Sequence, residues 1–364
     1  MKLFKHLLPL ALVGLAFTAC NDEEDHIEPL QPGTGINGVY VLNQGNQGKI
    51  EGILSYFDFK DYKPLHGIFK SANGQSLGDS PQDGVIYGSK LYIAVYGSDL
   101  VWAIDANTRK ILAQIPTTDP EGITAAGGNI YVSNNDGYVT KIDTTALKVV
   151  SKIEVGPNPV DLEARGNFLY VAVSDGYNWS KNYVNGFRVA KIDLRTFTNT
   201  KQDVKVGMNP GKLTQDANGN IFVVCNGNYG SIPGTIWRID AADRAAEYCK
   251  GTMAAAHGNS LYVVNYVVDY TTDYKNPKAN TTYAVWDTRS HTADTSHAWG
   301  KDLGHMPPAP TAINIAPRTG DVYLASDAAV GNYVSQGTIH IYDRTGKFLR
   351  TVVAGVHPVA SIFY

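Results

Sequence analysis

Apolar and polar positions alternate along most of this chain, and one pattern of alternation occurs seven times. Residues 130–143, IYVSNNDGYVTKID, show it in full: an apolar strand, a polar turn, a second strand and a closing Asp. Alternation with period two, rich in Val, Ile and Tyr, predicts half-buried β-strands. The Asp carboxylate can accept backbone N–H groups two residues on, which opens a tight turn. The copies share an aromatic residue in the first strand (Tyr40, Tyr92, Tyr131, Tyr170, Phe222, Tyr262 and Tyr323) and the Asp that ends the second (Asp58, Asp105, Asp143, Asp193, Asp240, Asp287 and Asp343).

A third apolar segment, usually led by a proline, precedes every aromatic strand except the first, and a last copy at 357–364 ends the chain. With a strand after the Asp, each unit has four strands in roughly 40–60 residues, which is typical of a propeller blade. The first unit lacks its leading strand and the last leading segment lacks a following strand, so together they complete one blade. The sequence therefore predicts an all-β, seven-bladed β-propeller with four antiparallel strands per blade, closed by the C-terminal strand.

The first 37 residues differ from the repeat. Lys2, Lys5 and His6 precede an apolar run at 7–17, which is too short to span a bilayer and is typical of a secretion signal. Residues 17–20, FTAC, resemble a bacterial lipobox, which implies cleavage before Cys20 and its lipidation; an ordinary secretory peptide is the alternative. We divide the chain into a lipoprotein signal peptide (1–19), a lipidated Cys20 with an acidic flexible tether (20–37) and the propeller (38–364).

Two further cysteines allow one disulfide. Cys225 ends an aromatic strand, and Cys249 precedes the next leading strand. In a propeller these positions lie on the same face of adjacent blades. A bridge suits an extracytoplasmic protein, and two separate thiols are the alternative.

The loops carry the clearest indication of function. Connections on one face are short hairpins, whereas several on the other are long, at 43–52, 174–187, 225–234, 265–281 and 326–337. Long loops usually serve function, and these are rich in Tyr, Trp and Asn, which suits a sizeable, amphipathic, mostly uncharged ligand. Loops of this composition that bind nothing are the alternative. The candidate ligand-binding residues on this face and on the proline-led rim of the central channel are Asn43, Asn46, Gln82, Tyr96, Glu121, Asn134, Tyr177, Trp179, Tyr183, Asn226, Tyr229, Tyr266, Tyr270, Tyr274, His305, Tyr333 and His357.

Signals for catalysis and metal binding are weak. There is no H-x-x-x-H, G-x-S-x-G, P-loop or C-x-x-C motif, and Asp136 and Asp175 do not belong to a spaced calcium loop. We expect no metal, no cofactor and no catalytic residue; an alternative lyase or hydrolase would use Glu121, Asp161 or His305 at the channel mouth. The net charge of −3 without a basic patch argues against nucleic acid as a partner.

The repeated strand pairs and the VGPNP and VGMNP segments (155–159 and 206–210) resemble the YncE-like seven-bladed propellers over residues 38–364. The opening GVYVLNQGNQG (38–48), the lipobox-like residues and the acidic run NDEED (21–25) are similar to a narrower group, the Bacteroides surface propeller lipoproteins that include BtuG-type cobalamin-binding proteins.

This resemblance implies a lipid-anchored protein on the outer face of the outer membrane. It would capture cobalamin or another corrinoid for a TonB-dependent transporter, without transforming it. Two alternatives remain open, a glycan-binding protein of a polysaccharide uptake system and an extracellular propeller lyase or hydrolase.

Overall fold

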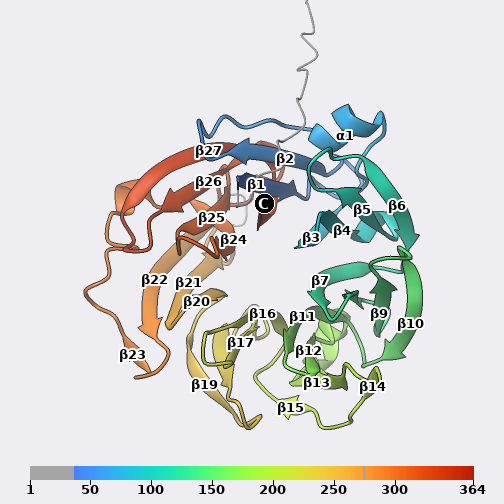
Figure 1. The fold of residues 1–364 in the computed structure, drawn as a ribbon. Coiled ribbons are helices and arrows are strands. Elements are labelled where there is room, and N and C mark those ends of the chain that lie inside the picture. Colours follow the sequence, from blue (N-terminus) through green and yellow to red (C-terminus); the bar gives the residue numbers. More distant parts are fainter. Residues whose placement is uncertain (1–36, 274–275) are drawn as a thin grey trace, which may run out of the picture.

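The predicted strands form seven antiparallel sheets that follow one another around a ring (Figure 1). The computed structural model describes residues 37–273 and 276–364. The signal peptide, Cys20, the tether up to residue 36 and Tyr274 therefore lie outside the described residues. Among the described residues, no helix is long and apolar enough to cross a membrane.

Six blades contain consecutive strands, with the first strand of each next to the channel and the last on the outside (Figure 1). One blade has its outer strand split into two short pieces that both pair with β13. The strands of these blades are β3 (Pro81–Tyr87), β4 (Lys90–Val95), β5 (Leu100–Asp105) and β6 (Ile111–Pro116); β7 (Pro120–Ala126), β8 (Asn129–Asn134), β9 (Tyr138–Asp143) and β10 (Lys148–Glu154); β11 (Pro159–Arg165), β12 (Phe168–Val173), β13 (Arg188–Asp193), β14 (Thr198–Asn199) and β15 (Val204–Lys205); β16 (Pro210–Gln215), β17 (Ile221–Cys225), β18 (Thr235–Ile239) and β19 (Ala245–Lys250); β20 (Met253–His257), β21 (Ser260–Asp269), β22 (Lys278–Asp287) and β23 (Thr292–Ala293); β24 (Ala309–Ile315), β25 (Val322–Asp327), β26 (Gln336–Tyr342) and β27 (Phe348–Val356).

The seventh blade joins the two ends of the described chain. Its inner strand is β28 (Pro358–Phe363), which pairs with β1 (Gly38–Asn43), and β1 pairs with β2 (Ile53–Asp58). The backbone N–H of Gly38 donates to the Tyr364 carbonyl at 2.8 Å, and the Tyr364 N–H donates back to Gly38 at 2.9 Å. The predicted closure of the ring by the C-terminal strand is confirmed.

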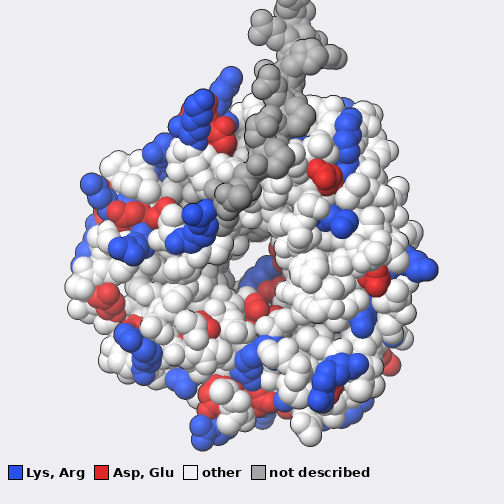
Figure 2. Space-filling model, viewed as in Figure 1, with Lys and Arg blue, Asp and Glu red and all other residues white. Residues whose placement is uncertain are grey.

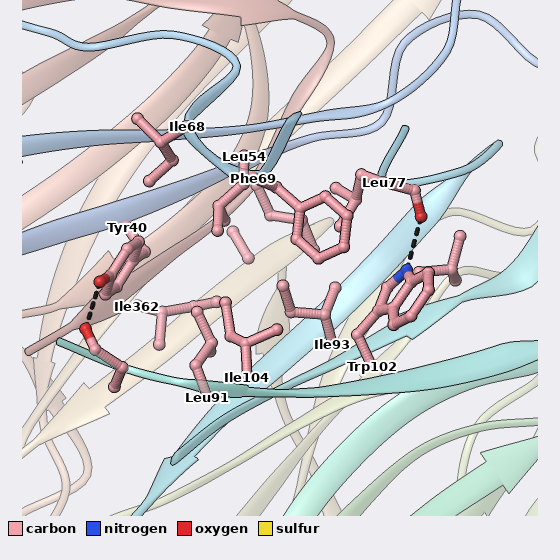
Figure 3. Packing of buried hydrophobic residues seen from close by; sticks show 14 of the residues in the cluster. Tyr40, Leu54, Ile68, Phe69, Leu77, Leu91, Ile93, Trp102, Ile104 and Ile362 are labelled. Carbon is pink, nitrogen blue, oxygen red and sulfur yellow. Dashed lines mark hydrogen bonds between the residues drawn. The ribbon is translucent and has the colours of Figure 1, made fainter. Parts of the chain in front are cut away.

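The outer position of this closing blade is filled differently from the other six. An isolated bridge between Tyr56 and Leu65 replaces a fourth strand, and the short helix α1 (Ile68–Asn73) follows it. Ile68 and Phe69 of α1 are buried, and the Phe69 ring lies 5.2 Å from the Trp102 ring of the next blade (Figure 3). The helix therefore covers the apolar side of the closing blade that a strand covers elsewhere.

The aromatic residue and the closing Asp that mark each copy of the repeat have the structural roles expected of them. All seven aromatic marks are buried, at 3% exposure or less, and they pack between blades. Figure 3 shows Tyr40 in such a contact, where its hydroxyl donates to the Ala106 carbonyl of the next blade. Each Asp mark accepts backbone N–H groups of the following turn, as Asp143 does from Thr145 at 2.8 Å and Ala146 at 2.7 Å. The same bonds recur at the other six Asp marks.

The proposed disulfide between Cys225 and Cys249 is wrong, because both cysteines are free thiols of one blade. Cys249 lies within β19, and β18 separates it from Cys225, since Ile236 of β18 pairs with both Val224 and Cys249. Strands are spaced by about 4.8 Å, so two spacings exceed the limit of about 7 Å between Cα atoms of a disulfide. Burial raises the pKa of each thiol to about 12, which keeps both protonated and unreactive.

Candidate functional site

The channel rim is built by the proline-led starts of the inner strands. Six inner strands have a register shift next to their leading proline, and only β20, which has no leading proline among these strands, pairs regularly. Proline cannot donate to the ladder, so it fits at a bulge, and a bulge re-aims the next side chains. The bulges therefore turn the second and third residues of these strands toward the channel.

The residue before the proline is also distinctive. In five blades it is a non-glycine residue with positive φ, and its carbonyl accepts a backbone N–H from the loop that leaves the aromatic strand. These bonds tie the loops that follow five of the aromatic strands to the start of the inner strand of the same blade, so the loops and the channel mouth share one face. The five residues are Ser80, Asp119, Asn158, Asn209 and His357.

The channel itself is a cavity of about 570 Å³. Figure 2 shows the hollow centre of the ring with acidic and basic atoms inside it. Lys212 of β16 reaches across to Asp83 of β3, with Nζ 2.8 Å from Oδ2, and lies 3.6 Å from Oδ1 of Asp161 on the neighbouring β11. Asp161 fits there because its neighbour on β7 is Gly122, where a Cβ would lie 2.7 Å from Oδ1 of Asp161.

Carboxylates outnumber cations in this channel. Glu163 follows Asp161 by two residues on β11 and faces the same side, and Glu121 lies at the start of β7. Burial raises the pKa of Glu121 to about 7 against the opposing charge of Lys212, and burial with the nearby Asp161 raises that of Glu163 to about 7. Burial alone would lower the pKa of Lys212, but Asp161 and Asp83 raise it, so Lys212 stays charged.

Around the mouth lies a set of aromatic side chains from five different blades, which we call the aromatic rim; all are exposed except Tyr96, which is half-buried. Tyr177, Trp179 and Tyr229 are 66%, 70% and 79% exposed, so little of each ring packs on protein. Such rings at separate points on one face are typical of a binding surface rather than a core. The aromatic rim consists of Tyr96, Tyr177, Trp179, Tyr229, Tyr270 and Tyr333, on the loops after β4, β12, β17, β21 and β25.

One side of the aromatic rim is joined to the channel by hydrogen bonds. The hydroxyls of Tyr96 and Tyr177 lie 2.7 Å apart. The Asn135 amide donates to the Tyr177 hydroxyl at 3.4 Å and to Oε1 of Glu121 at 2.6 Å. Asn158 supports this group, because it donates to the Asn135 carbonyl and accepts the Tyr177 N–H. Three blades thus hold one polar network.

The other side of the rim surrounds His357. Its Nδ1 lies 3.0 Å from both carboxylate oxygens of Asp327, a buried residue at the end of β25. The Tyr333 ring stands edge-on to the imidazole, with centroids 5.8 Å apart, and the Tyr270 side chain hydrogen-bonds to Tyr333. Asn46 donates its amide to the Tyr333 carbonyl at 3.2 Å, which ties the closing blade to this group.

Several predicted site residues are placed as expected. Gln82 and Asn226 line the channel, and Glu121 and His357 lie at its mouth. Tyr266 is half-buried beside Tyr270 and Tyr333. The loop predicted at 265–281 is largely a hairpin, because β21 and β22 pair as far as Asp269 and Lys278. Tyr266 therefore lies on a paired strand, and Tyr270 directly follows the last paired residue.

Other predicted residues are not available to a ligand. Asn43 is fully buried, where its amide donates to Val41, Ile53 and Ser55 and its carbonyl accepts the Gly355 N–H. Asn134 is fully buried between Thr117 and Thr140. Tyr183 is also buried, at 4% exposure. The Asn43 and Asn134 amides thus satisfy buried polar groups of the fold.

His305 is not at the rim. It lies in the 3₁₀ turn Leu303–His305, where its ring stacks on Phe348 of the outer strand β27 at 4.3 Å and its Nδ1 lies 2.7 Å from Asp302. The segment after β23 first follows the outside of the next blade and turns inward only at Ala309. The His305 prediction failed because the proline that leads the inner strand is Pro310, several residues farther on.

Sequence reasoning missed three residues of the site. Glu163 could have been predicted, because the two-residue period of β11 places it on the same side of the strand as Asp161. Asn135 follows the predicted Asn134 and is the one of the pair that reaches the channel side. Asp327 had no signal, since its partner is distant in the sequence. Among the described residues, no group of three or more His, Cys, Asp or Glu side chains could hold a metal ion.

Comparison with known proteins agrees with this architecture. No family model and no curated protein matches the chain. Solved structures do match. Hydrazine synthase of Kuenenia stuttgartiensis is similar with a TM-score of 0.60 and 17% sequence identity, over 78% of this chain and 89% of that one. A quinonprotein alcohol dehydrogenase-like protein of Bacteroides thetaiotaomicron is similar with a TM-score of 0.58 and 15% identity, over 90% of this chain and 78% of that one. The designed protein Ika8 is also similar, with a TM-score of 0.52 and 13% identity over 89% of this chain and 88% of that one. At these identities the likeness concerns the fold alone. The chain is a seven-bladed β-propeller.

Proposed function

We propose that this propeller captures a large amphipathic nutrient, cobalamin or another corrinoid, at the aromatic rim and does not transform it. The observation that carries the proposal is the rim itself: six Tyr and Trp side chains from five blades around one channel mouth. Rigid aromatic side chains with a polar edge give large contact area at small entropic cost. A corrin is a broad ring fringed with amides, so it can stack on such rings and bond to hydroxyls and amides.

The channel supports binding across the mouth rather than inside it. Its volume is about 570 Å³, and Lys212 crosses it to Asp83. A corrinoid is too broad for this space, whereas a side group of the ligand can enter as far as Gln82 and Asn226. The resemblance of residues 38–48 to the Bacteroides surface propellers favours the same ligand class.

We further propose that the protein is lipid-anchored through Cys20 on the outer face of the outer membrane and delivers its ligand to a TonB-dependent transporter. The described chain is compatible with this orientation. β1 runs from Gly38 to Asn43, and its loop after Asn43 lies on the face of the aromatic rim. Asn37 therefore lies on the opposite face, so an anchor attached before it would leave the rim directed away from the membrane.

Calorimetric titration of residues 37–364 with cyanocobalamin tests the proposal. We expect one-to-one binding, and we expect Trp179→Ala and Tyr229→Ala each to weaken it by about 1–3 kcal/mol, as anchors at an interface do. Leu349→Ala is the matched control, because Leu349 is also exposed but lies on the outer strand β27. An unchanged affinity in both rim variants, or no binding by the wild type, contradicts the proposal.

A glycan is the second candidate ligand. The observation that favours it is the exposure of Trp179 and Tyr229, since a free aromatic face can stack on a sugar ring. If cyanocobalamin produces no heat and no thermal shift, the same two rim variants should be compared on immobilised polysaccharides. Retention that is lost in Trp179→Ala but kept in Leu349→Ala would assign a glycan to this face.

A further inference from the structure

The imidazole of His357, paired with Asp327, lies at the aromatic rim, and the fold of the rim does not require a histidine there. His357 directly precedes Pro358 and has φ of 52°. It lies two residues before Val359, which lines the channel. Its ring is close to Tyr333 of the rim, and its side chain is 24% exposed. The imidazole is therefore fixed at the mouth and still open to a ligand.

Asp327 determines which imidazole nitrogen is open. Both of its oxygens lie 3.0 Å from Nδ1, so this nitrogen carries the proton and donates. The lone pair is then on Nε2, which has no hydrogen-bond partner among the described residues. A carboxylate bound to one nitrogen in this way fixes the orientation and the tautomer of the ring, as it does for histidines that bind metals.

Equivalent positions in other blades show that the backbone does not need a histidine. Asn158 and Asn209 also precede a leading proline with positive φ, and their carbonyls accept the same loop N–H groups. Their amides bond to loop carbonyls, those of Asn135 at 3.1 Å and Gly227 at 3.4 Å. Asparagine thus satisfies this turn. His357 adds a ring nitrogen with a free lone pair, which asparagine lacks.

We propose that Nε2 of His357 binds the metal of the captured ligand, as an axial ligand of the corrinoid cobalt, with Asp327 as its positioning residue. This inference rests on the proposed function. On a corrinoid whose axial site holds water, the Nε2 lone pair forms a Co–N bond, the Co–O bond breaks and water leaves. No electron is transferred, and cobalt(III) keeps its oxidation state. Cyanide binds cobalt more firmly than water does, so cyanocobalamin exchanges its axial ligand far less readily.

Aquocobalamin and cyanocobalamin are the probes for this bond. With the wild type, we expect the visible absorption spectrum of aquocobalamin to change to that of an imidazole complex, and its affinity to exceed that of cyanocobalamin by about tenfold or more. His357→Asn is the matched variant, because asparagine already occupies this turn in two other blades. It should abolish the spectral change of aquocobalamin and the difference in affinity between the two corrinoids. Asp327→Asn should retain part of the spectral change.

The outcomes separate this inference from the proposed function. Binding of both corrinoids with equal affinity and no spectral change in the wild type overturns coordination by His357 and leaves corrinoid capture standing. Binding of neither overturns the proposed function itself. A spectral change that persists in His357→Asn, with a native melting temperature, assigns the bond to another residue and also overturns the inference. A wild type without the spectral change overturns the inference even if a variant folds poorly.

Discussion

At the scale of single residues, the channel shows how β periodicity places like charges together. Asp161 and Glu163 are two apart on β11, so both face the channel, and the nearest ammonium, Lys212, bonds to Asp83 and Asp161. Glu163 has no cationic partner among the described residues. Its protonated form is therefore favoured by folding, which is why its pKa rises from 4.5 to about 7.

This shift predicts how stability depends on pH. A carboxyl whose pKa is raised in the folded state stabilises the protein below its unfolded pKa of 4.5, and this contribution is lost as pH rises through about 7. Between pH 5 and 8 the wild type should lose on the order of 2 kcal/mol relative to Glu163→Gln, which cannot ionise, allowing for water in the channel. Urea unfolding of both proteins at three pH values measures this, and parallel pH profiles would contradict it.

At the scale of elements, the repeat made the strands predictable because the residues that define a strand or turn lie within that strand or turn. The closing Asp and the leading proline act within one turn or strand, and the aromatic residue packs between blades from a fixed place in its own strand; all three have the expected role. Loop residues depend instead on distant partners. Asn43 bonds to Gly355, 312 residues away, and His305 packs on Phe348, so composition alone placed both wrongly on the ligand face. The exposure of Trp179 and Tyr229 could be predicted from composition, because both rings lie in loops and neither packs in a core cluster.

The closing strand β28 gives a prediction at the same scale. Deleting residues 359–364 should lower the melting temperature by at least about 10 °C, since it exposes the edge of β1 and removes the Ile362 contact with the next blade. Ile362→Ala keeps the backbone pairing and should cost about 2–4 kcal/mol. Differential scanning calorimetry compares them, and native melting of the truncated protein would show that the ring does not depend on this strand.

At the scale of the whole molecule, the ring is held by strand pairing at its closure and by charge across its centre. β3 and β16 belong to blades that do not touch in the ring, yet Lys212 and Asp83 join them at 2.8 Å. Lys212 is 53% exposed within the channel, so water and salt reach this pair and weaken it. The pair therefore acts as a modest brace for a ring whose neighbouring blades already pack on one another.

A double-mutant cycle measures that brace. Lys212→Met should cost more stability than Asp83→Asn, because it leaves Asp161 and Asp83 without an ammonium, whereas Asp83→Asn leaves Lys212 beside Asp161. We expect a coupling energy of about 0.5–1 kcal/mol from urea unfolding of the two single variants and the double variant, falling as salt rises. The pair Arg195–Asp193, which lies within one turn on the surface, is the control for salt effects. If the coupling is zero at low salt, the inner strands of opposite blades are held only through their neighbours, and ring closure depends on β28 alone.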